Sequence, residues 1–181
     1  MELVYAILIV IIIFGLMGIC YIFYYNRLQD CKLKVDEAES IIDEGLREKY
    51  DTLKEFKKII DKKVKTDKLS LKELDTLKDN DITNFDLDRK LTEFENTIVK
   101  LKDDYKDLRS DNSFNELIEK LRRINEKITA AKRYYNNYIT LSNEYVRKFP
   151  SNIVAKFHNI KLKNFFDNKD LNDEKLDDFK L

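Results

Sequence analysis

Residues 114–138 read FNELIEKLRRINEKITAAKRYYNNY, with an apolar residue at every third or fourth position. This spacing places the apolar residues on one face of an α-helix and leaves Lys, Arg and Glu on the others. The face continues, slightly rotated, through Leu141 and Tyr145 to Phe149, and Pro150 then ends the helix. Its first part comprises Phe114, Leu117, Leu121, Ile124, Ile128, Ala131, Tyr135 and Tyr138.

The ends of this predicted helix carry capping signals. Ser113 and Glu116 have the spacing of a capping box, in which each side chain bonds a backbone N–H of the first turn. After Pro150, Ser151 or Asn152 is expected to cap a shorter helix over residues 153–157.

Two further stretches show the same rhythm. Only three glycines and one proline occur in 181 residues, so the turns of a β fold are nearly absent. Gly45 is the single weak point of the first stretch, costing about 1 kcal/mol relative to Ala. The first stripe comprises Leu28, Cys31, Val35, Ala38, Ile42, Leu46, Leu53, Phe56, Ile60 and Val64, and the second comprises Leu87, Leu91, Phe94, Ile98, Leu101, Tyr105 and Leu108.

Three long apolar stripes cannot remain in water, because each buried Leu, Ile or Phe contributes about 1.5–3 kcal/mol. We therefore predict an all-α fold, an antiparallel bundle of three long helices with short helices added, over residues 26–166. Leu69, Leu71, Leu74 and Leu77 indicate one short helix, and residues 79–84 a loop with Thr83 or Asn84 as the next cap. Residues 167–181 are acidic and sparsely apolar, which predicts a disordered tail.

Residues 3–25 read LVYAILIVIIIFGLMGICYIFYY and contain no charged side chain. As a helix this segment spans roughly 35 Å, enough for a hydrocarbon core of about 30 Å. A cleaved signal peptide would have a preceding basic residue and a shorter apolar run, and a lipoprotein anchor at Cys20 would need a small residue in place of Ile19. A buried helix of a soluble core is the remaining alternative. We predict that residues 1–25 form a transmembrane anchor.

Basic residues lie only on one side of this segment. Arg27, Lys32 and Lys34 follow it closely, and none precedes it. The positive-inside bias then predicts a single-pass protein of the cell membrane, with a short N-terminus outside and the bundle in the cytoplasm.

Acidic and basic residues balance at 34 each, which argues against nucleic acid as a partner. Cys20 and Cys31 lie too far apart on one helix to form a disulfide. His158 is the only histidine, and no second ligand stands near it in sequence, so we expect no metal site and no cofactor. No catalytic motif is present, and we expect no enzymatic activity.

The strongest candidate for a binding surface is the tyrosine-rich end of the last long helix and the turn after it. Tyrosine is favoured at interfaces, but Tyr135 and Tyr138 are more simply explained as core residues whose hydroxyls reach the rim of the bundle. Asn136 is expected to hydrogen-bond across helices. The candidate residues are Tyr134, Tyr135, Asn136, Tyr138, Phe149, Pro150, Ser151 and Asn152.

Several short motifs resemble the signature of the LemA family. They are FNEL at 114–117, AAKRYYN at 130–136, NEY at 143–145 and FPSNIVA at 149–155, with YNRL at 25–28 and VDEA at 35–38 in the N-terminal half. The resemblance implies a bacterial, membrane-anchored protein with a cytoplasmic helical bundle and no established enzymatic activity. Lys54 and Glu55 stand where members usually carry Pro-Asn, and Lys132 where they carry Arg. Loss of the proline should make the first helix more continuous.

We therefore expect a membrane-tethered, non-enzymatic helical scaffold that touches the bilayer through residues 3–25 and binds unidentified proteins. Two alternatives are a structural protein that self-associates through coiled-coil-like helices as a homo-oligomer, and a metal-dependent regulator that uses His158.

Overall fold

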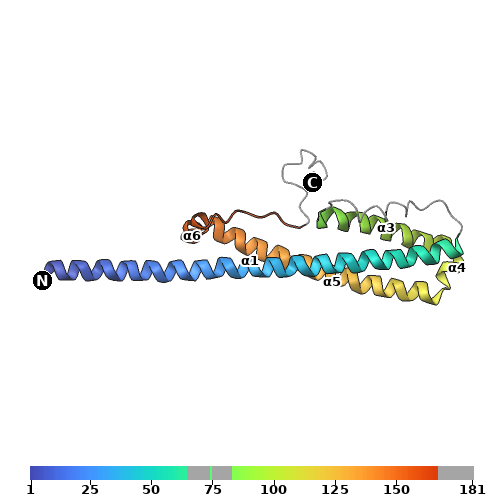
Figure 1. The fold of residues 1–181 in the computed structure, drawn as a ribbon, viewed down its shortest axis with the longest axis horizontal. Coiled ribbons are helices and arrows are strands. Elements are labelled where there is room, and N and C mark those ends of the chain that lie inside the picture. Colours follow the sequence, from blue (N-terminus) through green and yellow to red (C-terminus); the bar gives the residue numbers. More distant parts are fainter. Residues whose placement is uncertain (65–73, 75–82, 167–181) are drawn as a thin grey trace, which may run out of the picture. The chain divides into compact units, whose positions relative to one another are not determined.

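The computed structural model describes residues 1–64, 74 and 83–166. All regular elements within these ranges are helices, which confirms the all-α prediction (Figure 1). They are α1 (Glu2–Lys63), α3 (Asn84–Asp104), α4 (Lys106–Arg109), α5 (Asn112–Arg147) and α6 (Ser151–Phe157). Most of the short helix predicted from Leu69, Leu71, Leu74 and Leu77 lies outside the described residues, as does the predicted tail at 167–181. Leu74 is described and is buried.

The chain divides into two compact units. The first unit contains Met1–Glu37 and the chain from Tyr134 onward, and the second contains Ala38–Arg133. Helices α1 and α5 each contribute one part to each unit.

Helix α1 is continuous over 62 residues. Every residue of the stripe predicted between Leu28 and Val64 is buried, which confirms that periodicity. The helix passes Lys54 and Glu55 without a break, as the missing proline predicts. Its N-terminal part is exposed and is long and apolar enough to cross a membrane.

In the second unit, α5 runs antiparallel to both α1 and α3. Phe114 stacks edge-on against Phe56 with ring centroids 4.9 Å apart, near one end of the unit, and Ile128 packs on Gly45 farther along α1. Lys132 and Asp88, 2.6 Å apart, join α5 to α3. Consequently α1 and α3 point in the same direction in this unit (Figure 1).

The helix predicted for the second stripe, from Leu87 to Leu108, is broken in the structure. Tyr105 has extended backbone angles (φ −117°, ψ 113°), so α3 ends at Asp104 and the short α4 follows. At the start of α3, Thr83 is the cap as predicted, and its hydroxyl accepts the N–H of Asp86 at 3.2 Å.

The prediction of a capping box at Ser113 is wrong. Helix α5 begins at Asn112, and Oδ1 of Asp111 accepts the N–H of Phe114 at 2.8 Å. Asp111 also forms an ion pair with Lys63, the last residue of α1. This pair, together with the Phe114 hydrogen bond, lowers the pKa of Asp111, because both interactions stabilise the carboxylate.

The apolar face predicted for α5 is buried only as far as Ala131, apart from the half-buried Leu117. Ile139 and Ser142 are buried, whereas Tyr138 is only half-buried and Leu141 and Phe149 are exposed. The helix ends at Arg147, shortly before Pro150.

The contact at Gly45 requires the absence of a side chain. A Cβ at Gly45 would lie 2.6 Å from Cγ1 of Ile128, a branch atom with little rotamer freedom in a helix. This glycine therefore allows α1 and α5 to approach closely, which outweighs its poor helix propensity.

We predict that Gly45→Ala destabilises the protein by about 1 kcal/mol, because overpacking costs more than the gain in helix propensity. In an Ile128→Ala background, the same change should become stabilising. Thermal unfolding of the detergent-solubilised full chain, followed by circular dichroism, measures both effects. A more stable Gly45→Ala single variant would contradict this account of the contact.

Candidate functional site

Three polar side chains of the second unit meet between its long helices. Lys49 is 2% exposed and occupies the stripe position between Leu46 and Leu53. Its Nζ lies 2.8 Å from Oε2 of Glu95 on α3, while Nδ2 of Asn125 on α5 donates to Oε1 of Glu95 at 2.6 Å. Lys49 also donates to the hydroxyl of Thr92 at 3.1 Å. Pairing and hydrogen bonding make a buried ammonium tolerable here.

The candidate tyrosines fall into two groups. The rings of Tyr134 and Tyr138 stack with centroids 4.7 Å apart. Their mutual hydrogen bond is the main cause that raises the pKa of Tyr138. Lys34 of α1 donates to Glu37 at 2.9 Å and also hydrogen-bonds Tyr134, and both interactions raise the pKa of its ammonium group.

Tyr135 and Asn136 instead contact residues 159–166, which we call the C-terminal strap. The ring of Phe166 meets Tyr135 edge-on at 6.1 Å, and Oδ1 of Asn136 accepts the N–H of Phe166 at 2.8 Å. Asn136 therefore holds the strap, and the predicted bond across helices is wrong. The core position predicted for Tyr135 is also wrong, because the residue is only half-buried.

A second asparagine of α5, which the sequence analysis missed, holds the strap in the same way. Oδ1 of Asn143 accepts the N–H of Lys163 at 3.0 Å, and its Nδ2 donates to the carbonyl of the same residue at 2.9 Å. One amide side chain thus satisfies both backbone groups of one strap residue, as a neighbouring β-strand would.

The turn residues Phe149 to Asn152 lie apart from the tyrosines in the chain and have other contacts. Pro150 occupies the cap position of α6, and no side chain caps that helix, so the predicted cap at Ser151 or Asn152 is wrong. Ser151 is buried and donates to the carbonyl of Lys148 at 2.8 Å. Oδ1 of Asn152 is buried without a hydrogen-bond donor among the described residues.

His158 packs against the end of the apolar part of α1. Its Nε2 lies 2.7 Å from the hydroxyl of Tyr21, and its ring is 4.7 Å from that of Tyr25. Within the described ranges no three His, Cys, Asp or Glu side chains group closely enough to hold a metal ion. Burial, with a smaller contribution from Asp30, raises the pKa of the Cys31 thiol, which makes it a poor nucleophile.

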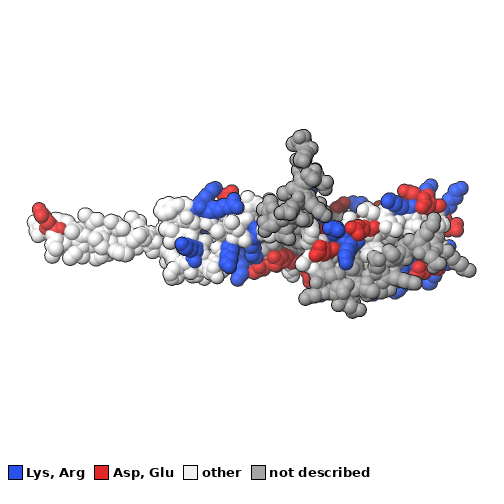
Figure 2. Space-filling view, turned by 90° about the horizontal axis from the view of Figure 1, so that it is seen from above, with Lys and Arg blue, Asp and Glu red and all other residues white. Residues whose placement is uncertain are grey.

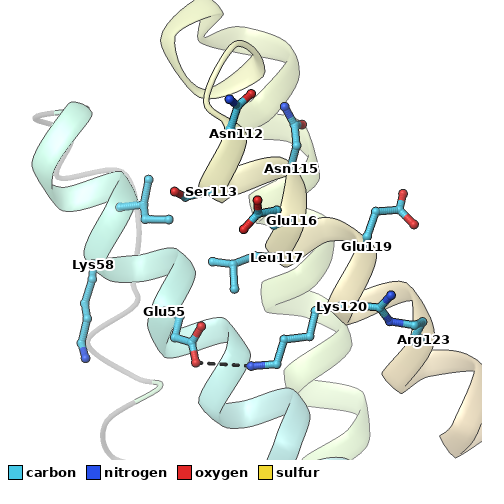
Figure 3. A pocket seen from close by; sticks show the side chains of 11 residues that line it. Glu55, Lys58, Asn112, Ser113, Asn115, Glu116, Leu117, Glu119, Lys120 and Arg123 are labelled. Carbon is cyan, nitrogen blue, oxygen red and sulfur yellow. Dashed lines mark hydrogen bonds and ion pairs between the residues drawn. The ribbon is translucent and has the colours of Figure 1, made fainter.

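An open groove of about 1000 Å³ lies between α1 and α5 in the second unit (Figure 3). Glu55 and Lys58 stand on the α1 side, and Glu116, Lys120 and Arg123 stand among the α5 residues that line it. Lys120 and Glu55 approach to 3.4 Å across the groove. The mixed charge and open form suit a protein surface better than a small ligand, which favours an enclosed, mostly apolar pocket.

The model of the LemA family matches residues 38–177 of the chain, which confirms the resemblance. The match begins at Ala38, which is the last residue of the motif at 35–38, and it therefore does not include the motif at 25–28. Neither the curated proteins nor the solved structures compared with the chain gave a match.

We predict that Asn143→Ala loosens the strap, because it removes both hydrogen bonds to Lys163. Backbone amides of residues 159–166 should exchange with deuterium about thirtyfold faster, since the two lost bonds contribute about 1 kcal/mol each to local stability. Hydrogen–deuterium exchange with mass spectrometry measures the change. Asn137→Ala, at an exposed position of the same helix, is the control and should leave the exchange unchanged. Equal exchange in both variants would show that Asn143 does not hold the strap.

Proposed function

Because the chain belongs to the LemA family and joins an exposed apolar helix to a charged helical unit, we propose that it is a membrane-anchored scaffold that binds proteins. The observation that carries this proposal is the continuity of α1. One uninterrupted helix bears both the exposed apolar segment and the buried stripe of the second unit, so the anchor and the folded part share a backbone.

The groove between α1 and α5 is our candidate for the partner site. It carries both signs of charge on two rigid helices, and charged groups at such a surface select a partner by complementarity. The groove replaces the tyrosine-rich end of α5 as the candidate site, because the tyrosines there contact each other, Lys34 and the strap.

Charge reversal tests the groove. Lys58→Glu with Arg123→Glu should remove at least one protein that co-purifies with the full chain from cross-linked, detergent-extracted membranes. The control combines Lys100→Glu on α3 with Arg133→Glu on α5, which changes the net charge equally outside the groove. An identical set of co-purifying proteins for both double variants would contradict the groove as the partner site.

We also propose that the second unit lies in the cytoplasm, on the basis of the basic residues that follow the apolar segment. Glu116→Cys places a thiol on the exposed groove wall, whereas native Cys31 is buried and Cys20 lies within the apolar segment. A membrane-impermeant maleimide should label this variant only after the cells are opened. Labelling in intact cells would reverse the orientation.

A further inference from the structure

Helix α6 has an apolar side that the described residues leave uncovered. Val154 and Ala155 are buried, but Ile153 is 59% exposed and Phe157 is 79% exposed. Phe149, in the turn before the helix, is also 79% exposed. These three apolar residues recur every four positions and form what we call the α6 apolar edge.

The α6 apolar edge is fixed beside the end of the apolar segment of α1. Val154 and Ala155 form one buried cluster with Leu28, and Tyr24 and Tyr25 pack around it. The ring of Phe157 meets that of Tyr21 edge-on at 6.4 Å, and the Tyr21–His158 hydrogen bond holds the next residue. The uncovered side of α6 thus adjoins the level at which the apolar run of α1 ends.

Among charged side chains, the segment of the chain that contains α6 carries only basic ones. Residues 147–166 contain no Asp or Glu, and their basic residues are Arg147, Lys148, Lys156, Lys161 and Lys163. Of these, Lys148 pairs with Glu144 at 2.8 Å. In Figure 2 the uncharged surface of the rod continues onto the start of the broader part, and Lys and Arg, with fewer Asp and Glu among them, follow farther along the molecule. This order of apolar and then basic surface matches the order of acyl chains and anionic headgroups in a bilayer.

We propose that the α6 apolar edge lies in the headgroup region of the bilayer and forms a second membrane contact beside the transmembrane segment. The inference rests on the proposed anchoring by residues 3–25. Tyrosines at positions 21, 24 and 25 supply the aromatic belt that is common where a helix leaves the membrane. The edge is therefore continuous with the surface that α1 presents to lipid, and its occupant is lipid carrying anionic headgroups.

The absence of tryptophan from the chain allows a direct test with single-tryptophan reporters. The full-length Phe157→Trp variant is reconstituted in vesicles of phosphatidylcholine and phosphatidylglycerol. The phosphatidylcholine carries bromine, which quenches tryptophan fluorescence, either high or low on its acyl chains. Phe14→Trp, in the middle of the apolar segment, is the control for a tryptophan deep in the bilayer. Asn137→Trp, on the exposed surface of α5, is the control for a tryptophan in water.

We expect bromine to quench Phe157→Trp about threefold more strongly than Asn137→Trp, because an interfacial helix buries its apolar side at the headgroup boundary. Bromine high on the chains should be the stronger quencher for Phe157→Trp, and bromine low on the chains for Phe14→Trp. A second reporter, Phe149→Trp, should be quenched like Phe157→Trp. Agreement between the two excludes the explanation that the substitution at one position changed the local structure.

The possible failures are distinguishable. If Phe14→Trp is quenched but Phe157→Trp and Phe149→Trp are quenched no more than Asn137→Trp, the proposed anchoring by residues 3–25 is supported and the inference about α6 is wrong. If Phe14→Trp is not quenched, the proposed anchoring fails and the inference fails with it.

Discussion

Burial of one apolar stripe on α1 is the constraint on which both units depend. A helix of this length is not held by backbone propensity alone, and most helical stability in proteins comes from packing of an apolar face. In the first unit the stripe is covered at Leu28 by Val154 and Ala155 of α6. In the second unit, Phe56 meets Phe114 and Gly45 receives Ile128, both from α5. Each neighbouring element is placed by the part of the stripe that it covers.

Local periodicity was sufficient to predict the buried face of α1 but failed in the second half of α5. The predicted face steps by three and four in strict alternation, which is a repeat of 3.5 residues. A straight helix with 3.6 residues per turn drifts by about 20° per heptad from such a repeat. Between Phe114 and Tyr138 the drift approaches the angle between neighbouring residues, so Ile139 replaces Tyr138 in the buried face. The same drift places Ser142 inside and Leu141 outside.

The contacts of the candidate site were less predictable, because their partners are distant in sequence. Asn136 was correctly chosen as a hydrogen-bonding residue, but its partner lies in a strap that has no helical or strand periodicity. His158 and Tyr21 are separated by most of the chain, and nothing in either neighbourhood indicates their contact. The choice of Asp111 over Ser113 as the cap depended likewise on Lys63, a residue at the far end of another helix.

Lys49 has a consequence for how the three helices of the second unit align lengthwise. Apolar stripes are tolerant of sliding, because a shift by one helical turn of about 5.4 Å still sets leucine against leucine. Lys49, Glu95 and Asn125 come from three different helices, and each bond has a fixed place along its axis. A slipped arrangement would strand an ammonium ion inside the core without its carboxylate, which costs several kcal/mol. The contacts among Lys49, Glu95 and Asn125 thus select one lengthwise register of the three helices from several that would bury similar apolar area.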